Sequence, residues 1–337
     1  MTTPPNPDAR GGERLAWARA ATGRDDLALV RASTDAGFRS YWRATAPGTP
    51  DRVVMDSPPG LEDVRPWLRV HALLAAGGVR VPEVLAGDPD AGFLLLEDLG
   101  VATCLQVLDA GNADALFDAA IDQLLRLQAI ECPGWLPAYD AALLRRELGL
   151  FDAWFLGTHL GIALDPEERA QLDAACARLV DAALAQPSVL VHRDFMPRNL
   201  MPVEGGVAVL DFQDAVRGPI AYDVLSLFKD AFASWPEARV DTWVARYHGR
   251  AAEAGLPVGD LAAFRRDVDW IGVQRHLKVL GIFARLHHRD GKPKYLADAP
   301  RFLAYLDGVL PRHPSLAPLH ALLRRRVAPA LARGGDA

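Results

Sequence analysis

The chain has 337 residues and a mass of 36.5 kDa; 50% of the residues are hydrophobic and 24% are charged. This composition excludes a disordered or fibrous protein, because it supplies enough apolar surface to build a core. The length exceeds what one compact core needs and predicts two globular units. A net charge of −6 and a pI near 5.9 argue against sequence-independent nucleic-acid binding, which needs a basic domain, and favour a small-molecule partner.

The sequence also predicts a soluble, cytosolic protein that acts away from membranes. Its apolar runs, such as Phe93–Leu96, stay far below the roughly 18 residues that a membrane-spanning helix needs. The chain opens without the charged and apolar segments of a leader peptide. Cys104, Cys132 and Cys176 are odd in number and lack Cys-x-x-Cys spacing, so we expect neither a disulfide framework nor a zinc site. We expect the three cysteines to be small residues of the hydrophobic core. We also expect the protein to be a monomer.

The first part of the chain has the pattern of a small β-rich unit. Residues 1–12 combine prolines and glycines without an apolar period, which predicts a flexible tail. Residues 13–98 are predicted to form an N-terminal nucleotide-binding lobe, because short apolar runs bounded by turn residues are typical of strands. Strands are expected at 27–30, 38–43, 52–55, 79–85 and 93–96, and a helix at 63–76.

The pattern changes at residues 97–100, where we expect a hinge. Residues 99–337 are predicted to form a larger C-terminal lobe, because apolar residues recur there at helical spacing. Helices are expected at 117–128, 142–155, 166–185, 224–230, 236–254 and 261–287, and two short β-runs at 189–191 and 207–210. The sequence therefore predicts an α+β fold with two lobes around a cleft.

Residues next to the second β-run form a candidate metal site. Glu204-Gly205-Gly206 is a turn signal between two apolar runs and predicts a hairpin. If the hairpin is centred on Gly205, Asn199 and Asp211 face each other at a Cβ separation of about 5 Å. An amide oxygen beside a carboxylate suits Mg²⁺, which takes its remaining ligands from phosphates and water. Asp194 precedes Asn199 in the same loop and is left to face an incoming hydroxyl.

These residues carry a resemblance to a known family. His192-Arg193-Asp194 and Asn199, followed by Asp211-Phe212-Gln213, resemble the catalytic and metal signature of the protein-kinase-like fold. The resemblance implies a small β-rich N-terminal lobe and a larger helical C-terminal lobe. It implies that Asp194 orients the acceptor hydroxyl and accepts its proton, and that Asn199 and Asp211 hold Mg²⁺ on the phosphates of ATP. His192 is then a support of the catalytic loop.

The residues that follow distinguish between branches of this fold. Only Gly218–Ala221 separates the motif region from Tyr222 and Asp223, which leaves no room for the peptide-docking loop of a protein kinase. The run 211–223 resembles the aminoglycoside phosphotransferase family of small-molecule kinases. In that family the aspartate matched by Asp223 braces the catalytic loop. An N-cap of the next helix is the alternative role of Asp223.

Within this family, four runs resemble the anomeric kinases of N-acetylmuramate and N-acetylglucosamine in cell-wall recycling; they lie at 54–59, 92–100, 211–227 and 274–286. This resemblance implies ATP-dependent phosphorylation of the C1 hydroxyl to a sugar 1-phosphate. Two alternatives stay open. One is a kinase of the same fold that acts on an antibiotic, choline, homoserine or methylthioribose. The other is a pseudokinase that senses a nucleotide or serves as a scaffold.

The sequence departs from the family where a lysine normally holds the nucleotide phosphates. The third strand ends in Val53-Val54-Met55-Asp56 without a lysine, and the next helix has Trp67 where we would look for the partner glutamate. Because the metal and base positions are intact, we expect another cation to substitute. The candidates are Arg39, Arg43, Arg65 and Arg69.

Nucleotide contacts are predicted in two segments. The segment 33–40 has a single glycine, and its backbone N–H groups can cradle phosphate. The linker backbone from Glu97 to Leu99 offers hydrogen bonds to adenine, beside apolar walls from Leu95 and Leu96. The predicted nucleotide-binding residues are Ser33, Thr34, Gly37, Phe38, Arg43, Leu96, Glu97 and Leu99.

The charge of the C-terminal part bears on the substrate. Between residues 265 and 301 there are nine Lys or Arg against four Asp, which disfavours a polycationic substrate. An uncharged amino sugar, or N-acetylmuramate with its carboxylate, fits better. The predicted substrate contacts are Arg198, Gln213, Arg275, His276 and Lys278. For the last three, a solvated helix face is the alternative.

Overall fold

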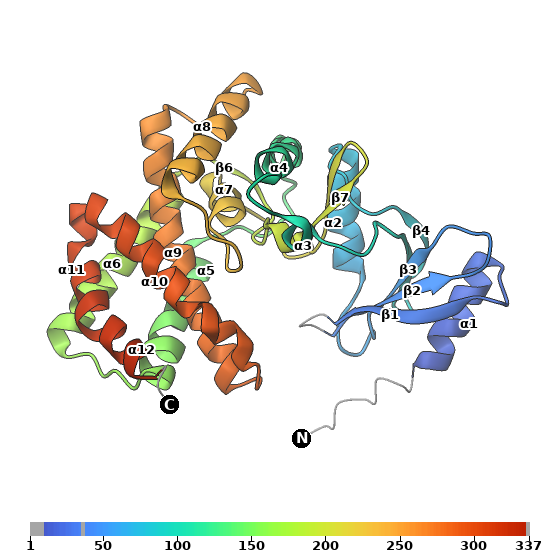
Figure 1. The fold of residues 1–337 in the computed structure, drawn as a ribbon, viewed down its shortest axis with the longest axis horizontal. Helices are drawn as coiled ribbons and strands as arrows, with labels where there is room; N and C mark the ends of the chain where they lie inside the picture. The colour runs from blue at the N-terminus through green and yellow to red at the C-terminus, as the bar shows by residue number, and fades with distance from the viewer. Residues whose placement is uncertain (1–9, 35–37, 335–337) are drawn as a thin grey trace. The chain divides into compact units, whose positions relative to one another are not determined.

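The structure is a computed structural model that describes residues 10–34 and 38–334. The chain divides into two compact units (Figure 1). The first contains the described residues up to Arg126 together with Pro197–Gln213. The second contains Leu127–Met196 together with the residues from Asp214 onward. The expected hinge at 97–100 lies inside the first unit; its motion and the predicted lobe boundaries stay predictions.

The first unit is built on a five-stranded antiparallel sheet with the strand order β1-β2-β3-β5-β4. A separate hairpin, β7-β8, belongs to the same unit. The elements are α1 (Gly11–Thr22), β1 (Ala28–Thr34), β2 (Ser40–Thr45), β3 (Arg52–Asp56), α2 (Arg65–Ala76), β4 (Val84–Asp88), β5 (Phe93–Glu97), α3 (Cys104–Val107), α4 (Ala113–Gln128), the 3-10 turn η2 (Pro197–Asn199), β7 (Leu200–Val203) and β8 (Gly206–Val209). The predicted strands β1, β2, β3 and β5 and the helix α2 are confirmed, whereas α1 and α3 were not predicted.

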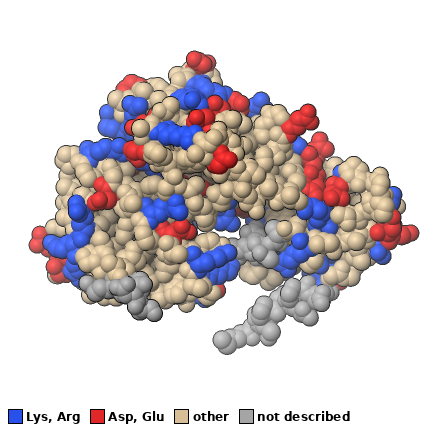
Figure 2. Space-filling model, in the orientation of Figure 1, with Lys and Arg blue, Asp and Glu red and all other residues tan. Residues whose placement is uncertain are grey.

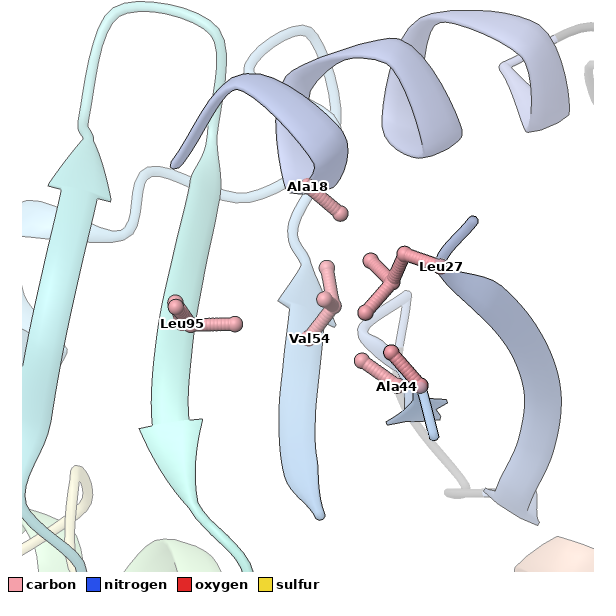
Figure 3. Close-up of a cluster of buried hydrophobic side chains, with 6 residues drawn as sticks. Ala18, Leu27, Ala44, Val54 and Leu95 are labelled. Carbon is pink, nitrogen blue, oxygen red and sulfur yellow. The ribbon is translucent and has the colours of Figure 1, made fainter. Parts of the chain in front are cut away.

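Helix α1 packs against the sheet through small apolar residues. Figure 3 shows Ala18 of α1 facing Leu27, Val54 and the neighbouring strand residues Ala44 and Leu95. All five side chains are buried. The alternation of side chains along each strand brings Ala44, Val54 and Leu95 to one face of the sheet, and Ala18 and Leu27 pack against that face.

The start of α1 corrects the expected flexible tail at its last three residues. Residues 1–9 lie outside the described part of the chain, but Gly11 and Gly12 open α1. Arg10 donates to Asp56 Oδ1 at 3.1 Å and to the carbonyl of Ala91 at 2.6 Å. Arg14 pairs with the same Asp56 at 2.8 Å, so two ion pairs fix the beginning of the helix on β3.

Strand β4 begins later than predicted. The sequence favours a strand at 79–85, but regular pairing starts at Val84. Pro82 has no N–H to donate to a ladder. The backbone groups before β4 use side chains instead: Arg80 N donates to Gln123 Oε1 at 2.7 Å, and the carbonyl of Pro82 lies 2.8 Å from His71 Nε2.

The second unit consists mainly of helices around α9, the longest of them, which packs against α5, η1, α6, α7 and α10 (Figure 1). Its elements are α5 (Ala141–Leu150), the π-helix η1 (Phe151–His159), α6 (Pro166–Ala185), β6 (Ser188–Val191), β9 (Val216–Pro219), α7 (Ala221–Phe228), α8 (Glu237–Glu253), α9 (Leu261–His288), η3 (Pro293–Asp298), α10 (Ala299–Val309), η4 (Leu310–Arg312), η5 (Pro314–Leu316), α11 (Ala317–Leu322), η6 (Leu323–Val327) and α12 (Ala328–Gly334). The predicted helices are confirmed in position, although the one expected at 142–155 continues as a π-helix. Strand β9, which pairs with β6, and the C-terminal helices were not predicted.

The β7-β8 hairpin has a register one residue away from the predicted one. Val203 pairs with Gly206, which leaves Glu204 and Gly205 as a two-residue turn, and Leu200 pairs with Val209. The turn uses Gly205 at φ +78°, a conformation that glycine adopts readily. Asn199 is therefore opposite Leu210, whose N–H donates to the Asn199 carbonyl at 2.9 Å, and not opposite Asp211.

Charged side chains of both signs are interspersed on the face shown in Figure 2. Within residues 10–34 and 38–334, no helix has the length and apolar character needed to cross a bilayer. The three cysteines are free; Cys104 is buried as expected, whereas Cys132 and Cys176 are half-buried. Burial raises the pKa of Cys104 to about 12.

Candidate active site

A pocket of about 350 Å³ lies entirely within the first unit. Its apolar walls come from the sheet and from the β7-β8 hairpin, and its polar lining comes from the linker after β5 and from the ends of the hairpin. The lining residues are Ala32, Tyr41, Arg43, Val53, Trp67, Pro82, Leu96, Glu97, Asp98, Leu99, Gly100, Val101, Thr103, Arg198, Asn199, Met201, Leu210, Asp211 and Phe212. A pocket with mostly apolar walls and a few polar groups at its edge is typical of a small-molecule or cofactor site.

Two arginine–carboxylate pairs fix the linker at the edge of this pocket. Arg80 holds Glu97 with Nη2–Oε1 at 2.5 Å and Nη1–Oε2 at 2.8 Å. Arg43 forms a two-armed ion pair with Asp98 and also donates to the carbonyl of Gly100 at 2.8 Å. The hydrogen bonds from Arg80 hold the pKa of Glu97 below its ordinary value. Bidentate pairs of this kind constrain geometry as well as charge, so the linker has a defined conformation.

Asn199 and Asp211 come together at the end of the hairpin, although they are not cross-strand partners. Asn199 Nδ2 lies 3.5 Å from Asp211 Oδ2, and Gln213 Nε2 donates to Asp211 Oδ1 at 2.9 Å. Asp211 has φ +61°, a left-handed conformation that turns its backbone out of the strand direction. This turn, and not the strand register, brings the two side chains together.

The donor set fits a magnesium ion. Asp211 supplies a carboxylate whose side chain is 38% exposed, and a rotation of the Asn199 amide presents its oxygen in place of its nitrogen. Within the described residues, no group of three or more His, Cys, Asp or Glu side chains could hold a metal ion. A site with few protein ligands suits Mg²⁺, which keeps water and phosphate ligands.

Among the four candidate arginines, Arg39 lies beside Asp211, one of the two predicted metal ligands. Its side chain is 7% exposed; Nε lies 3.2 Å from Glu62 Oε1, and Nη2 lies 3.8 Å from Asp211 Oδ1. Arg43 is engaged with the linker, whereas Arg65 is exposed and paired with Asp63 and Asp90. Arg69 is exposed on α2.

The predicted catalytic loop begins where β6 ends, in the second unit. Asp223 is fully buried and accepts from the backbone N–H of His192 at 2.7 Å and of Arg193 at 3.0 Å. Burial raises the pKa of Asp223 to about 6, although these N–H groups and His192 act in the opposite direction. The ring of His192 is buried, and its Nδ1 accepts from the N–H of Asp194 at 3.2 Å. The loop is therefore held at three consecutive residues.

Asp194 lies half-buried beside a cation of α9. Its side chain is 42% exposed, and Oδ1 lies 3.3 Å from Nη2 of Arg275. Burial acts to raise the pKa of Asp194, but the charges of Arg275, Lys278, His192 and Arg193 outweigh it and leave the pKa below its ordinary value. The carboxylate is thus ionised at neutral pH and can accept a proton.

A cluster of buried charged side chains contacts the predicted catalytic loop through Arg193. Glu147 of α5 accepts from Arg193 Nη2 at 2.6 Å and from Lys278 Nζ at 2.9 Å, and the Tyr139 hydroxyl donates to it. Tyr222 Oη accepts from Lys278 at 2.9 Å and from Arg275 at 2.8 Å. Every charged member of the cluster is thus paired, as buried charges must be.

The predicted substrate contacts fall in different places. Lys278 is buried in the ionic cluster, and His276 is buried with its ring 5.0 Å from that of Tyr305. Burial lowers the pKa of His276 to about 3, so its ring is neutral. Arg198 lines the pocket of the first unit, and Gln213 holds Asp211. The structure excludes the alternative of a solvated face for Arg275, His276 and Lys278, because all three side chains are buried; their contact with a substrate stays a prediction.

The predicted nucleotide residues are only partly described. Leu96, Glu97, Leu99 and Arg43 line the pocket. Phe38 is exposed, at 61% of its surface. For Ser33 and Thr34 the structure describes only the backbone, in β1, and Gly37 lies outside the described residues.

The polar residues of these sites that were missed from the sequence include Glu62, Glu147 and Tyr222. Glu62 lies three residues before α2, outside the helix in which a glutamate partner was sought. Glu147 follows Leu144 by three residues on the buried face of α5, so a charge in an apolar stripe was the available signal. Tyr222 is adjacent to the identified Asp223 but has no signature of its own.

Known proteins resemble this chain in sequence and in fold. The model of the phosphotransferase enzyme family, APH, matches residues 28–262. An N-acetylmuramate/N-acetylglucosamine kinase of Pseudomonas aeruginosa is 54% identical over 296 residues, covering 88% of this chain and 87% of the relative. A protein with the same name from Neisseria meningitidis is 46% identical and covers 91% and 93%.

Solved structures share the architecture at low sequence identity. Choline kinase LicA from Streptococcus pneumoniae has a TM-score of 0.63 at 15% identity, covering 88% of this chain and 99% of its own. The ADP-bound aminoglycoside phosphotransferase APH(2'')-Ib has a TM-score of 0.57 at 15% identity, covering 87% and 97%. These likenesses confirm the predicted protein-kinase-like α+β fold, and the family match together with the close relatives shows that this chain belongs to the phosphotransferase enzyme family, APH.

Proposed function

We propose that this protein is a kinase that transfers the γ-phosphoryl group of ATP to the anomeric hydroxyl of N-acetylmuramate and N-acetylglucosamine. The 54% identity to the Pseudomonas aeruginosa kinase of that name, over 88% of the chain, carries the choice of substrate. The catalytic-loop aspartate and the Asn199–Asp211 pair support the reaction type.

In the proposed reaction, Asp194 takes the proton from the anomeric hydroxyl of the sugar. At the same time, the oxygen of that hydroxyl bonds to the γ-phosphorus of ATP. The bond from that phosphorus to the bridging oxygen of the diphosphate breaks, and ADP leaves with the electron pair. The products are the sugar 1-phosphate, ADP and one proton. An ionised Asp194 held in a fixed orientation is what this step requires of the protein.

Asn199 and Asp211 are the residues that we propose to hold the metal. Bound Mg²⁺ neutralises charge on the phosphate oxygens of the nucleotide. Gln213 donates to Asp211 and fixes the orientation of that carboxylate. It stands where the Asp-Phe-Gly motif of related kinases has its glycine. Arg198 extends the positive edge of the same pocket.

We assign the nucleotide to the pocket of the first unit. Leu96, Val53 and Met201 supply its apolar walls, and the linker from Glu97 to Leu99 supplies backbone groups for the base. Arg39 is proposed as the cation that takes the place of the missing third-strand lysine, with Glu62 as its partner, because it is buried beside the metal-binding Asp211. The phosphate-binding segment predicted at 33–40 remains part of this proposal.

The proposal places the reaction in cell-wall recycling, where these sugars are released. Because ATP is a cytoplasmic metabolite, the proposal includes a cytoplasmic enzyme. A kinase of another hydroxyl compound is the second candidate, since choline kinase and an aminoglycoside phosphotransferase have the same fold.

The test is ³¹P NMR of the protein with ATP, MgCl₂ and one acceptor per tube: N-acetylmuramate, N-acetylglucosamine, kanamycin, choline or homoserine. The expected result is a new phosphate doublet, coupled to the anomeric proton, in the two sugar tubes alone. Turnover of kanamycin, choline or homoserine without turnover of either sugar contradicts the proposal. An Asp194→Asn tube controls for contaminating kinases.

A further inference from the structure

The residue before the proposed catalytic base has a strained backbone. Arg193 has φ +77°, in the left-handed region that residues with a Cβ rarely occupy. Such a conformation is unfavourable and persists only where surrounding contacts enforce it. The direction in which Asp194 leaves the loop depends on this turn, because the two residues share a peptide bond.

Three contacts enforce the turn at Arg193. Its N–H donates to Asp223 Oδ1 at 3.0 Å, and its side chain pairs with Glu147 at 2.6 Å. Its carbonyl accepts from Arg275 Nη1 at 2.7 Å. The first contact is one of the two hydrogen bonds by which Asp223 holds the loop. The other two contacts come from α5 and α9, which are distant from Arg193 in sequence.

Arg275 is the residue that joins this turn to the carboxylate. Its side chain is 5% exposed, and while Nη1 binds the Arg193 carbonyl, Nη2 lies 3.3 Å from Asp194 Oδ1. A guanidinium is planar, so its two arms hold the carbonyl and the carboxylate in a fixed relation. A lysine has a single ammonium group on a flexible chain and cannot reproduce this fork.

We propose that Arg275 is a positioning residue: it couples the strained Arg193 turn to the Asp194 carboxylate and so orients the base toward the acceptor hydroxyl. The proposal rests on the proposed function in that Asp194 serves there as the base. It gives α9 a role in the reaction that the predicted substrate contacts of this helix did not include.

The surroundings of Arg275 fix its own position. Nη1 also donates to Tyr222 Oη at 2.8 Å, and that oxygen accepts from Lys278 at 2.9 Å. Lys278 is in turn held by Glu147 at 2.9 Å. A chain of ion pairs and hydrogen bonds therefore runs from α5 through α9 to the catalytic loop, and its members have little room to move because they are buried.

The charges that act on Asp194 make the proposal measurable without turnover. His192 and Arg193 of the loop and Arg275 and Lys278 of α9 are the charged or titratable groups that lower its pKa. Removal of Arg275 deletes the charge that lowers the pKa of Asp194 most. The pKa of Asp194 is therefore expected to rise in Arg275→Met and to stay near its wild-type value in Arg275→Lys.

The experiment compares wild type, Arg275→Met, Arg275→Lys and Arg265→Gln, an exposed arginine on the same helix as a control. The kcat of sugar phosphorylation is expected to fall about 100-fold in Arg275→Met and about 10-fold in Arg275→Lys, since a displacement of about 1 Å can cost 10²-fold. The KM for ATP is expected to stay within about two-fold, because the nucleotide pocket belongs to the other unit. Arg265→Gln should match wild type.

The second readout is the pKa of Asp194, measured by ¹³C NMR with Asp194→Asn to assign the signal. This pKa can be measured without an acceptor. If the wild-type protein does not phosphorylate either sugar, that result contradicts the proposed function, but the effect of Arg275 on the pKa of Asp194 is still measured. A folded Arg275→Met with kcat within two-fold of wild type and an unchanged Asp194 pKa overturns the proposal. If Arg275→Met does not fold, Arg275→Lys decides: an unchanged kcat overturns the proposal, and a reduced kcat at unchanged melting temperature supports it.

Discussion

The guanidinium of Arg39 lies 3.8 Å from the carboxylate of Asp211 and 3.2 Å from that of Glu62. In the proposed function, Arg39 and Glu62 take the places of the missing lysine and glutamate, beside the carboxylate of Asp211 that is proposed to hold the metal. Arg39 immediately precedes β2, whereas the lysine would have been expected on β3.

Arg39→Ala is expected to raise the KM for ATP and lower kcat, with a combined loss of about 10–100-fold in kcat/KM, since a hydrogen bond to a charged group contributes about 1.5–3 kcal/mol. Arg39→Lys should retain more activity, and Glu62→Gln should show the smaller effect of a misplaced arginine. Steady-state kinetics at varied ATP measures all three. Arg65→Ala, at an exposed arginine of α2, is the matched control; equal losses in Arg65→Ala and Arg39→Ala contradict the assignment.

Asp194→Asn is expected to lower kcat by about 10²–10⁴-fold, the contribution of a positioned general base. The affinity for ATP should stay unchanged, because Asp194 and the nucleotide pocket belong to different units. Calorimetric titration with ATP and a turnover assay measure the two quantities on one sample. Undiminished turnover by Asp194→Asn would show that another group takes the proton.

The Arg43–Asp98 pair is expected to control nucleotide affinity through the linker. Arg43→Gln removes the link to both Asp98 and the Gly100 carbonyl, so the KM for ATP should rise while kcat stays nearly constant. A double-mutant cycle with Asp98→Asn should give a coupling of about 1–3 kcal/mol in nucleotide binding, as neighbouring charged residues do. Additive effects of the two changes would mean that the pair does not act as a unit.

Gly281→Ala is expected to destabilise the second unit by about 3 kcal/mol, the cost of overpacking a tight contact. A Cβ at this position would lie 2.3 Å from the carbonyl carbon of Leu150 and 2.5 Å from the nitrogen of Phe151, so backbone must move. Gly272→Ala on the same helix is the control, since its Cβ would meet only the Leu225 side chain at 3.0 Å. Urea unfolding measures the free energy of unfolding of both variants. Similar values would contradict a close approach of α9 to the backbone of Leu150 and Phe151 at Gly281.

Asp230 is expected to make stability depend on pH. It is buried, its Oδ1 accepts from the N–H of Phe232 and Ala233, and burial raises its pKa to about 6. Because the folded pKa lies above the ordinary value, the folded state binds more protons, and this contribution to stability is lost as the pH rises through 6.

Asp230→Asn removes the buried charge. We therefore expect it to stabilise the protein by about 1–3 kcal/mol at pH 8 and by less at pH 5. Thermal unfolding at the two pH values measures the difference, with Glu253→Gln, at an exposed site, as the control. A stability difference that is equal at both pH values contradicts the assignment.

The sequence predicted most elements and the catalytic motif, because both depend on local patterns. Apolar periodicity located α6, α8 and α9 closely, and the spacing of Asp194, Asn199 and Asp211 carried the family resemblance. The first strands and α2 were also found in this way. Local patterns failed at β4, where Pro82 and side-chain acceptors replace ladder bonds, and in α1, whose weak apolar stripe relies on Arg10 and Arg14 to bind Asp56.

The partners of the site residues were decided only by the tertiary structure. Asn199 and Asp211 meet through the left-handed backbone of Asp211, not through the predicted register. Arg275 was predicted as a substrate contact, with a solvated helix face as the alternative, but the packing of α9 on α5 and α7 buries it against the predicted catalytic loop. Spacing along the sequence shows which residues share a helix face. Burial and ion pairing depend on which residues lie opposite that face. Those residues come from distant segments, which only the folded chain brings into contact.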